Sequence, residues 1–403
     1  PFGMLYIPMG SFHMGPSDQD VPNALTAQSK MVSVQAFYMD QTEITNNEYR
    51  QFVYNVRDSI ARKMLAEEID EEYYLNTENE FGEEMDPPTI NWYAKLKWDD
   101  SDNREALEPL YLSPGERFLR RRELDVRKLN YSYYWIDFRR AATRASRDAL
   151  TAEKGERHKF STDRSSFLMK DEVNVYPDTL AWIHDFTYSF NEPMTQSYFW
   201  HPAYDEYPVV GVSWQQATAF CTWRTQLLND FLISGGGTAV NDFRLPTESE
   251  WEWAARGGLD LSPYPWGGPY LRNTRGCFLA NFKPLRGNYT DDGGFHTVPT
   301  MSYNPNDFGL FCMSGNVAEW TCNAFDESAY NFSHDLNPDY KYNAKDSDPE
   351  VLKRKVIRGG SWKDVGYYLQ TGTRTYEYQD TAKCYIGFRC VMTYLGRAKE
   401  DNI

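Results

Sequence analysis

The stretch Phe243-Arg-Leu-Pro-Thr-Glu-Ser-Glu-Trp-Glu-Trp-Ala-Ala-Arg-Gly-Gly258 contains the clearest local structural signals in this sequence. Thr247 stands where a helix N-cap is expected, because its hydroxyl can accept a hydrogen bond from a backbone N–H of the first turn. Gly257 is suited to end the same helix, since glycine adopts the left-handed backbone conformation at little cost. The stretch therefore predicts one short helix, and few regular elements are visible in the sequence after it.

Two further helices are predicted upstream. Thr45 and Glu48 have the spacing of a capping box, and Ser213 is a second N-cap. The apolar residues that follow Thr45 at helical spacing are Tyr49, Phe52, Val53 and Val56. The apolar side expected after Ser213 comprises Ala217, Phe220, Cys221 and Leu227. Residues 4–15 are predicted as strand, turn and strand, and residues 32–39 alternate as one strand.

Composition limits the class of protein. The chain has 403 residues, an aromatic content of 16% and a net charge of −16. A charge of this sign argues against nucleic acid as a partner, because phosphates are bound by clustered Lys and Arg. No apolar run reaches the roughly 18 to 20 residues of a membrane span. The sequence begins at Pro1 without an initiator Met, so we expect that an N-terminal segment precedes it.

The cysteines and histidines show no spacing typical of a metal site. The cysteines are Cys221, Cys277, Cys312, Cys322, Cys384 and Cys390, and no C-x-x-C occurs among them. Their even number is compatible with disulfides in an oxidising compartment, and free buried thiols are the alternative. No two histidines are three or four residues apart, which excludes H-E-x-x-H and related helical metal pairs.

Between residues 56 and 204 the charge is segregated. An acidic part comprises Glu67, Glu68, Asp70, Glu71, Glu72, Glu78, Glu80, Glu83 and Glu84. A basic part, predicted to be helical, comprises Arg117, Arg120, Arg121, Arg122, Arg127, Lys128, Arg139, Arg140, Arg144 and Arg147. One interpretation is a pair of solvated helix faces. The other is two opposed surfaces that contact each other, or neighbours in an assembly.

Several motifs occur in the order that they have in one enzyme family. They are Tyr6-Ile-Pro-x-Gly-Ser-Phe-x-Met-Gly15, Pro208-Val-Val-Gly-Val-Ser-Trp214, Arg244-Leu-Pro-Thr-Glu-x-Glu-Trp251, Gly315-Asn-Val-Ala-Glu-Trp320, Arg358-Gly-Gly-Ser-Trp362 and Gly387-Phe-Arg-Cys390. The chain thereby resembles the formylglycine-generating enzymes (sulfatase-modifying factors). The resemblance implies a loop-rich α+β fold, a variant of the C-type lectin fold. It covers residues 1–55 and 205–397, and it leaves residues 56–204 as a large, mainly helical insertion.

The resemblance also identifies what the chain lacks. Enzymes of the family bind copper(I) through two thiolates and oxidise a substrate cysteine, and soft Cu(I) selects sulfur ligands. The two copper-binding positions fall on Asp364 and Leu369, and no Cys lies between Cys322 and Cys384 that could replace them. Relatives that use iron need a histidine cluster, which the spacing of the histidines does not supply. The sequence therefore predicts no copper and no oxidase activity.

Two structural features of the family are implied as well. A family disulfide would join Cys221 to Cys390. The family also holds two calcium ions through oxygen ligands. The positions that match these ligands are Asn281, Phe282, Asp292, Phe295, Gly315, Val317 and Glu319. Cys312 replaces a ligand Asn, which weakens the second site, and a salt bridge from Glu319 to an Arg is the alternative.

The insertion resembles one non-enzymatic branch, the GldK/PorK lipoproteins of gliding motility and type IX secretion. The stretches that carry this resemblance are residues 44–53, 56–60, 176–182, 188–193 and 201–214. It implies an N-terminal lipid on the periplasmic face of the outer membrane, and a ring formed by self-association and with a GldN/PorN-type partner. Interface candidates are Arg117, Arg120, Arg121, Arg122 and Arg127. A peptidoglycan- or glycan-binding module and an active oxidase are the competing hypotheses.

Overall fold

The computed structural model describes residues 3–16, 29–78, 82–137, 141–144, 167–185, 192–285, 288, 290 and 294–396. The chain divides into two compact units, Pro1–Phe52 with Pro177–Ile403 (unit 1) and Val53–Tyr176 (unit 2). Helix α1 (Asn46–Glu68) begins in unit 1 and continues into unit 2. None of the described helices combines the length and the apolar character that a membrane crossing requires.

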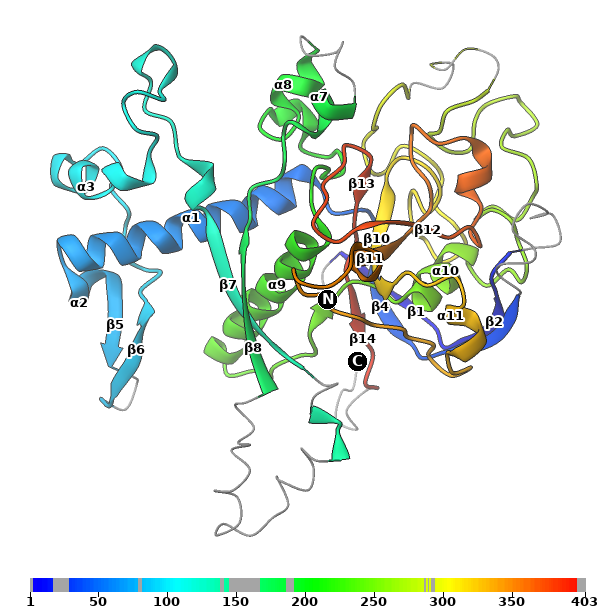
Figure 1. Cartoon of the computed structure of the whole chain (residues 1–403), viewed down its shortest axis with the longest axis horizontal. Helices are drawn as coiled ribbons and strands as arrows, with labels where there is room; N and C mark the ends of the chain where they lie inside the picture. The colour runs from blue at the N-terminus through cyan, green and yellow to red at the C-terminus, as the bar shows by residue number, and fades with distance from the viewer. Residues whose placement is uncertain are drawn as a thin grey trace. The chain divides into compact units, whose positions relative to one another are not determined.

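Two four-stranded sheets and a hairpin organise the described part of unit 1 (Figure 1). The first sheet has the order β1 (Met4–Ile7), β4 (Phe37–Asp40), β14 (Val391–Thr393) and β9 (Phe243–Arg244). The second has the order β12 (Thr375–Tyr378), β11 (Arg354–Arg358), β10 (Ala318–Ala324) and β13 (Ile386–Gly387). The hairpin joins β2 (Gly10–Met14) to β3 (Lys30–Val34). Since β4 pairs with both β1 and β14, the first and last strands of the chain stabilise the same sheet.

The described helices of unit 1 include the two predicted after Ser213 and Thr247 and three short ones that the sequence did not predict. They are α7 (Ala181–Asp185), α8 (Pro193–Ser197), α9 (Trp214–Ser234), α10 (Glu248–Arg256) and α11 (Ala329–Phe332), with 3₁₀ turns at Pro202–Tyr204, Glu350–Lys353 and Gly366–Leu369. Thr247 and Ser213 each form a complete capping box, and Gly257 ends α10 with a φ of 61°. Thr45 and Glu48 exchange hydrogen bonds in the same way at the start of α1. These caps confirm the predicted helix starts.

The core of unit 1 lies between α10 and the first sheet. Trp251 and Ala254 of α10 are fully buried and belong to one apolar cluster with Ile7, Phe37 and Val391. Burial of each large apolar side chain of this kind contributes about 1.5–3 kcal/mol. The residues of the Phe243–Gly258 stretch therefore hold the two ends of the chain together.

Unit 2 contains the remainder of α1 together with short helices and two β-hairpins. Its further elements are α2 (Glu71–Tyr74), β5 (Leu75–Glu78), β6 (Glu84–Ile90), α3 (Ser101–Ala106), β7 (Asn130–Ile136) and β8 (Leu168–Asn174), with 3₁₀ turns at Glu108–Leu110, Phe118–Arg120 and Val126–Lys128. A small core includes Ala61 and Leu65 of α1 with Tyr74, Leu107 and Leu110.

Some predictions of local structure are wrong. Between residues 118 and 136 the basic part of unit 2 is not an α-helix, because residues 118–120 and 126–128 form 3₁₀ turns and residues 130–136 pair with β8. Helices therefore account for only part of the described insertion. Residues 32–39 form parts of two strands, β3 and β4, in different sheets. Leu227, expected on the apolar side of α9, is 49% exposed. Arg139, Arg140 and Arg147 lie outside the described residues.

Candidate functional site

The loop that follows β11 contains the two positions at which the family's enzymes carry thiolates. Gly359 and Gly360 begin this loop with φ values of 90° and 65°. A Cβ atom at Gly360 would stand 2.7 Å from the carbonyl oxygen of Tyr368. Glycine is thus required where the loop passes close to its own later backbone, a conformation that side-chain-bearing residues rarely adopt.

Asp364, at the first thiolate position, stabilises a turn. Its Oδ2 accepts hydrogen bonds from the backbone N–H of Ser361 at 2.9 Å and from the Ser361 hydroxyl at 2.6 Å. Its carbonyl oxygen accepts a hydrogen bond from the N–H of Lys283 at 2.8 Å. These bonds keep the loop folded through oxygen atoms, which soft Cu(I) does not favour.

Leu369, at the second thiolate position, is part of the core. The side chain is fully buried in an apolar cluster with Tyr264, Ala280 and Phe282. The carbonyl oxygen of Leu369 accepts a hydrogen bond from the Ser314 hydroxyl at 2.7 Å. A position filled by a core leucine offers no ligand atom to a metal ion, so the residues present do not fit the copper site of the family.

Aromatic side chains cover Trp362, which lies in the sequence between the Gly359-Gly360 pair and Asp364. Trp182 of α7 is stacked on it with ring centroids 5.8 Å apart, and His296 meets it edge-on at 4.8 Å. Trp362 is 6% exposed. Burial lowers the pKa of His296, although Glu192, 3.4 Å from its Nε2, partly opposes this effect. An uncharged imidazole therefore packs against the indole as a third ring.

A second contact ties α7 to this region. The Sγ of Cys384 lies 3.1 Å from Oδ2 of Asp185, the last residue of α7. Burial, followed by the nearby Asp185 carboxylate, raises the pKa of the Cys384 thiol, so the thiol stays protonated and donates to the carboxylate. The sequence placed residues 177–204 in the insertion. By their contacts they belong to unit 1. The stretch 176–182 includes Trp182 but assigned it no role, and no motif pointed to Asp185 or His296, because their partners are far away in sequence.

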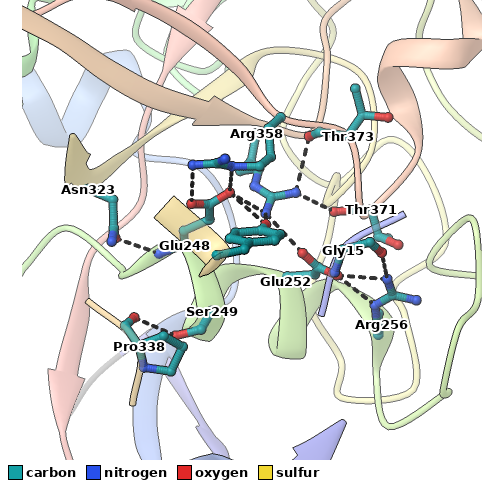
Figure 2. Close-up of polar contacts among 12 residues, drawn as sticks. Gly15, Glu248, Ser249, Glu252, Arg256, Asn323, Pro338, Arg358, Thr371 and Thr373 are labelled. Atoms are coloured by element: carbon teal, nitrogen blue, oxygen red, sulfur yellow. Dashed lines mark hydrogen bonds and ion pairs between the residues drawn. The ribbon is translucent and has the colours of Figure 1, made fainter. Parts of the chain in front are cut away.

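A buried network of ion pairs anchors the loop at Arg358 (Figure 2). One Nη of Arg358 lies 2.5 Å from Glu248 and 2.9 Å from Glu252, and Arg256 pairs with Glu252 at 2.7 Å. Burial by itself raises the pKa of Glu248, but Arg374 and Arg358 outweigh it and hold the pKa below its usual value. The other Nη of Arg358 donates to the carbonyl oxygens of Thr371 and Thr373. Arg358 therefore connects the loop to α10 and has a structural role.

The Glu319 carboxylate is engaged by an arginine. Its two oxygens accept hydrogen bonds from Arg389 at 2.6 and 2.8 Å, and Trp251 donates to it at 2.7 Å. This is the salt bridge considered as the alternative to calcium binding. A guanidinium that already neutralises the carboxylate competes with a cation, so Glu319 as placed does not fit a calcium ligand.

The other calcium candidates form a structural loop contact. Asn281 donates to the His296 carbonyl oxygen at 2.6 Å and accepts the Asn316 N–H at 2.9 Å through its own carbonyl. A Cβ atom at Gly315 would stand 2.4 Å from the Asn281 carbonyl oxygen. Phe282 and Val317 are buried, Phe295 is exposed, and Asp292 lies outside the described residues. In the described ranges, no three His, Cys, Asp or Glu residues converge as a metal site would require. Calcium binding at Asn281, Phe282, Asp292 and Phe295 stays a prediction.

Glu43 is a buried carboxylate that sequence reasoning missed. It is fully buried, and its Oε1 accepts a hydrogen bond from Asn316 Nδ2 at 3.0 Å. Its Oε2 has no hydrogen-bond partner within the described part of the chain. Burial raises its pKa to about 8, with Arg389 as the largest opposing influence. A single Glu before a predicted helix carries no signal of such an environment.

The thiols of Cys221 and Cys390 lie together, as the family disulfide requires. Their Sγ atoms are 3.4 Å apart, and both residues are buried. The structure describes them as free cysteines, so the disulfide itself stays a prediction.

The sheets, the capped helices and the loop after β11 define a loop-rich α+β protein of the formylglycine-generating-enzyme type. The family described as "Sulfatase-modifying factor enzyme 1-like domain" matches residues 2–394, and the chain belongs to this family.

The curated relatives include proteins named as inactive and as active. The chain is 35% identical over 192 residues to the inactive Cα-formylglycine-generating enzyme 2 of Bos taurus, which covers 46% of this chain and 50% of that protein. It is 33% identical over 188 residues to the formylglycine-generating enzyme of Streptomyces coelicolor, covering 46% and 52%. The chain thus spans about half the length of the curated relatives that it matches. Similarity to both kinds leaves activity to be argued from the residues of the site.

Solved structures resemble the chain over almost its whole length. PvdO from Pseudomonas aeruginosa has a TM-score of 0.48 at 15% identity, covering 97% of this chain and 94% of that one. CarF has a TM-score of 0.41 at 17% identity, covering 98% and 99%.

Proposed function

We propose that this protein is a non-catalytic member of its family and serves as a structural component of a larger assembly. The observation that carries the proposal is that residues without sulfur occupy the two positions where the family's enzymes have thiolates. Asp364 holds a turn through its carboxylate, and Leu369 fills an apolar core. A linear bis-thiolate copper site needs sulfur at both positions, so the chain lacks the means to oxidise a cysteine.

The cover over Trp362 supports the same proposal. Trp182 and His296 pack on this indole and on each other, and the Cys384 thiol is hydrogen-bonded to Asp185. Cys384 is therefore protonated and sequestered, and the thiolate is the form that reacts or binds metal.

The assembly that we propose is the ring of the gliding and type IX secretion machinery. The resemblance of residues 44–53, 56–60, 176–182, 188–193 and 201–214 to GldK/PorK lipoproteins supports it. On this proposal the chain is anchored by an N-terminal lipid at the periplasmic face of the outer membrane. It associates there with copies of itself and with a GldN/PorN-type protein through heterologous contacts.

Ion pairs separate the interface candidates into two groups. Arg117 pairs with Glu108, while Arg127 pairs with Asp125. Arg122 also pairs with Glu108. These three arginines stabilise unit 2 itself, which makes them weaker candidates for contacts with a partner.

Arg120 and Arg121 are the stronger candidates. Both are exposed, and no ion pair to either is found among the residues that the structure describes. They follow Phe118 and Leu119, which are 68% and 72% exposed, in a turn where Leu119 and Arg120 both have positive φ. Arginines beside exposed apolar side chains are typical of interface hot spots. A strained turn of this kind is worth testing as a contact surface.

Two measurements test the proposal. In the first, the protein is incubated with copper(I) and a peptide that contains the substrate cysteine, and mass spectrometry follows formylglycine. We expect no conversion, and turnover would contradict the non-catalytic role.

In the second, the lipid-anchored protein is purified natively, and its complexes are identified by mass spectrometry and imaged. We expect rings that contain a second protein. The variant Arg120→Glu/Arg121→Glu should recover several-fold less of that partner. The control Lys95→Glu/Lys97→Glu makes the same change in charge at exposed positions of unit 2 and should leave recovery unchanged. Equal recovery with both variants would exclude this turn as a contact.

A further inference from the structure

Unit 1 contains an open pocket of about 330 Å³. The residues that give it its chemical character are Trp266, Asn273, Phe278, Ser302, Tyr303 and Asn304. None of them lies in the Arg358–Leu369 loop, and none of the residues that line the pocket is charged. The volume lies at the lower end of the roughly 300–1,000 Å³ found for small-molecule sites.

The aromatic walls of this pocket are fixed in place. Trp266 is stacked on Tyr264, with ring centroids 5.0 Å apart and ring planes 6° from parallel. Its Nε1 donates to the Tyr270 carbonyl oxygen at 2.8 Å. The Arg272 guanidinium lies 3.8 Å from the ring centre of Phe278. Because the indole N–H is already used, what Trp266 offers to a ligand is apolar ring surface.

The polar groups of the pocket are amides and hydroxyls with unused capacity. Asn273 accepts the backbone N–H groups of Arg275 and Cys277 through Oδ1, and its Nδ2 has no partner in the described part of the chain. Asn304 is exposed, and its side-chain amide makes no hydrogen bond there either. Ser302 donates its hydroxyl to the Pro299 carbonyl oxygen at 2.7 Å and can still accept. An amide offers both donors and an acceptor to one ligand.

We propose that this pocket binds an uncharged saccharide of one or two pyranose rings. The C–H face of a pyranose packs on an aromatic ring, and its hydroxyls both donate to and accept from Asn side chains. A cationic ligand would find no carboxylate among the lining residues, and the guanidinium beside them, that of Arg272, already stacks on Phe278 and donates to the Gly276 carbonyl oxygen. Nucleotides are disfavoured in addition by the net charge of −16. This site is separate from the proposed assembly role and does not depend on it.

The test is saturation-transfer NMR on the full chain, with maltose, cellobiose and N,N′-diacetylchitobiose as saccharide probes. Adenosine, a nucleoside with a purine and a furanose but no pyranose ring, is the contrast probe. We expect transfer to at least one disaccharide and none to adenosine. Asn304→Ala should weaken binding about fivefold, as the loss of one hydrogen bond predicts. Trp266→Leu should weaken it further. Asn331→Ala, an exposed asparagine of α11 outside the pocket, is the control and should bind as the unmodified chain does.

Two results would overturn the proposal. One is the absence of transfer to all three disaccharides. The other is transfer that is equal in Asn304→Ala and in the control, or that is stronger for adenosine. Because Asn304 is exposed, its substitution tests the site even where Trp266→Leu lowers stability.

Discussion

At the scale of single residues, a buried lysine connects the stability of unit 1 to pH. Lys355 of β11 is fully buried, donates to the Tyr342 carbonyl oxygen at 2.7 Å, and lies 3.7 Å from the ring centre of Trp214. Burial lowers its pKa from 10.5 to about 7. The ionised lysine is therefore less stable in the folded chain than in the unfolded chain.

The sign of the pH dependence follows from this lowered pKa. Between pH of about 7 and 10.5 the unfolded chain binds more protons at Lys355 than the folded chain, so folding stability rises with pH. The rise from one group is at most about 1.4 kcal/mol per pH unit. Lys355→Met should remove this rise, as measured by urea unfolding across that window. The exposed Lys345→Met is the control, and an unchanged slope in Lys355→Met would contradict the assignment.

At the scale of secondary-structure elements, α7 holds the cover on Trp362. Replacement of a buried Trp by Ala costs about 3–5 kcal/mol in a protein core. Trp182→Ala should therefore loosen α7 and increase the rate of Cys384 alkylation, measured by peptide mass spectrometry. The rate at Cys322, a buried cysteine of β10, should stay unchanged if the effect is local. Trp200→Ala, at a half-exposed ring of the same segment, is the control. Slow alkylation of Cys384 in Trp182→Ala would show that α7 is not the barrier.

Local elements could be predicted from the sequence, and long-range ones could not. The caps at Thr45, Ser213 and Thr247 depend on hydrogen bonds to residues three positions away. A short sequence pattern therefore includes both partners of each bond. The strand at residues 130–136 forms only because residues 168–174 pair with it, and its arginine-rich surroundings suggested a helix instead. The loss of thiolates at Asp364 and Leu369 could be read from the resemblance to the enzyme family, whereas the packing of Trp182 and His296 on Trp362 could not.

At the scale of the whole molecule, the Cys221–Cys390 pair would join α9 to the residue that directly precedes β14, an inner strand of the first sheet. The two residues are 169 positions apart, and a disulfide closing such a loop contributes about 4–5 kcal/mol in the chain-entropy model. We expect peptide maps of the oxidised protein to contain this disulfide, and reductant to lower the urea midpoint. Cys221→Ala/Cys390→Ala should be insensitive to reductant. Alkylation of both thiols in protein purified under oxidising conditions would contradict the prediction.

The Arg358 network has a consequence for the way such proteins are sorted. Arg358 is held by Glu248 and Glu252 of α10, so it stabilises the fold whether or not the loop after it carries thiolates. A genome survey that takes Arg-Gly-Gly-Ser-Trp and Gly-Phe-Arg-Cys as signs of an oxidase would therefore detect the fold and not the catalytic site. To separate catalysts from structural proteins, the survey should read the second and seventh residues after the tryptophan, which in this chain are Asp364 and Leu369.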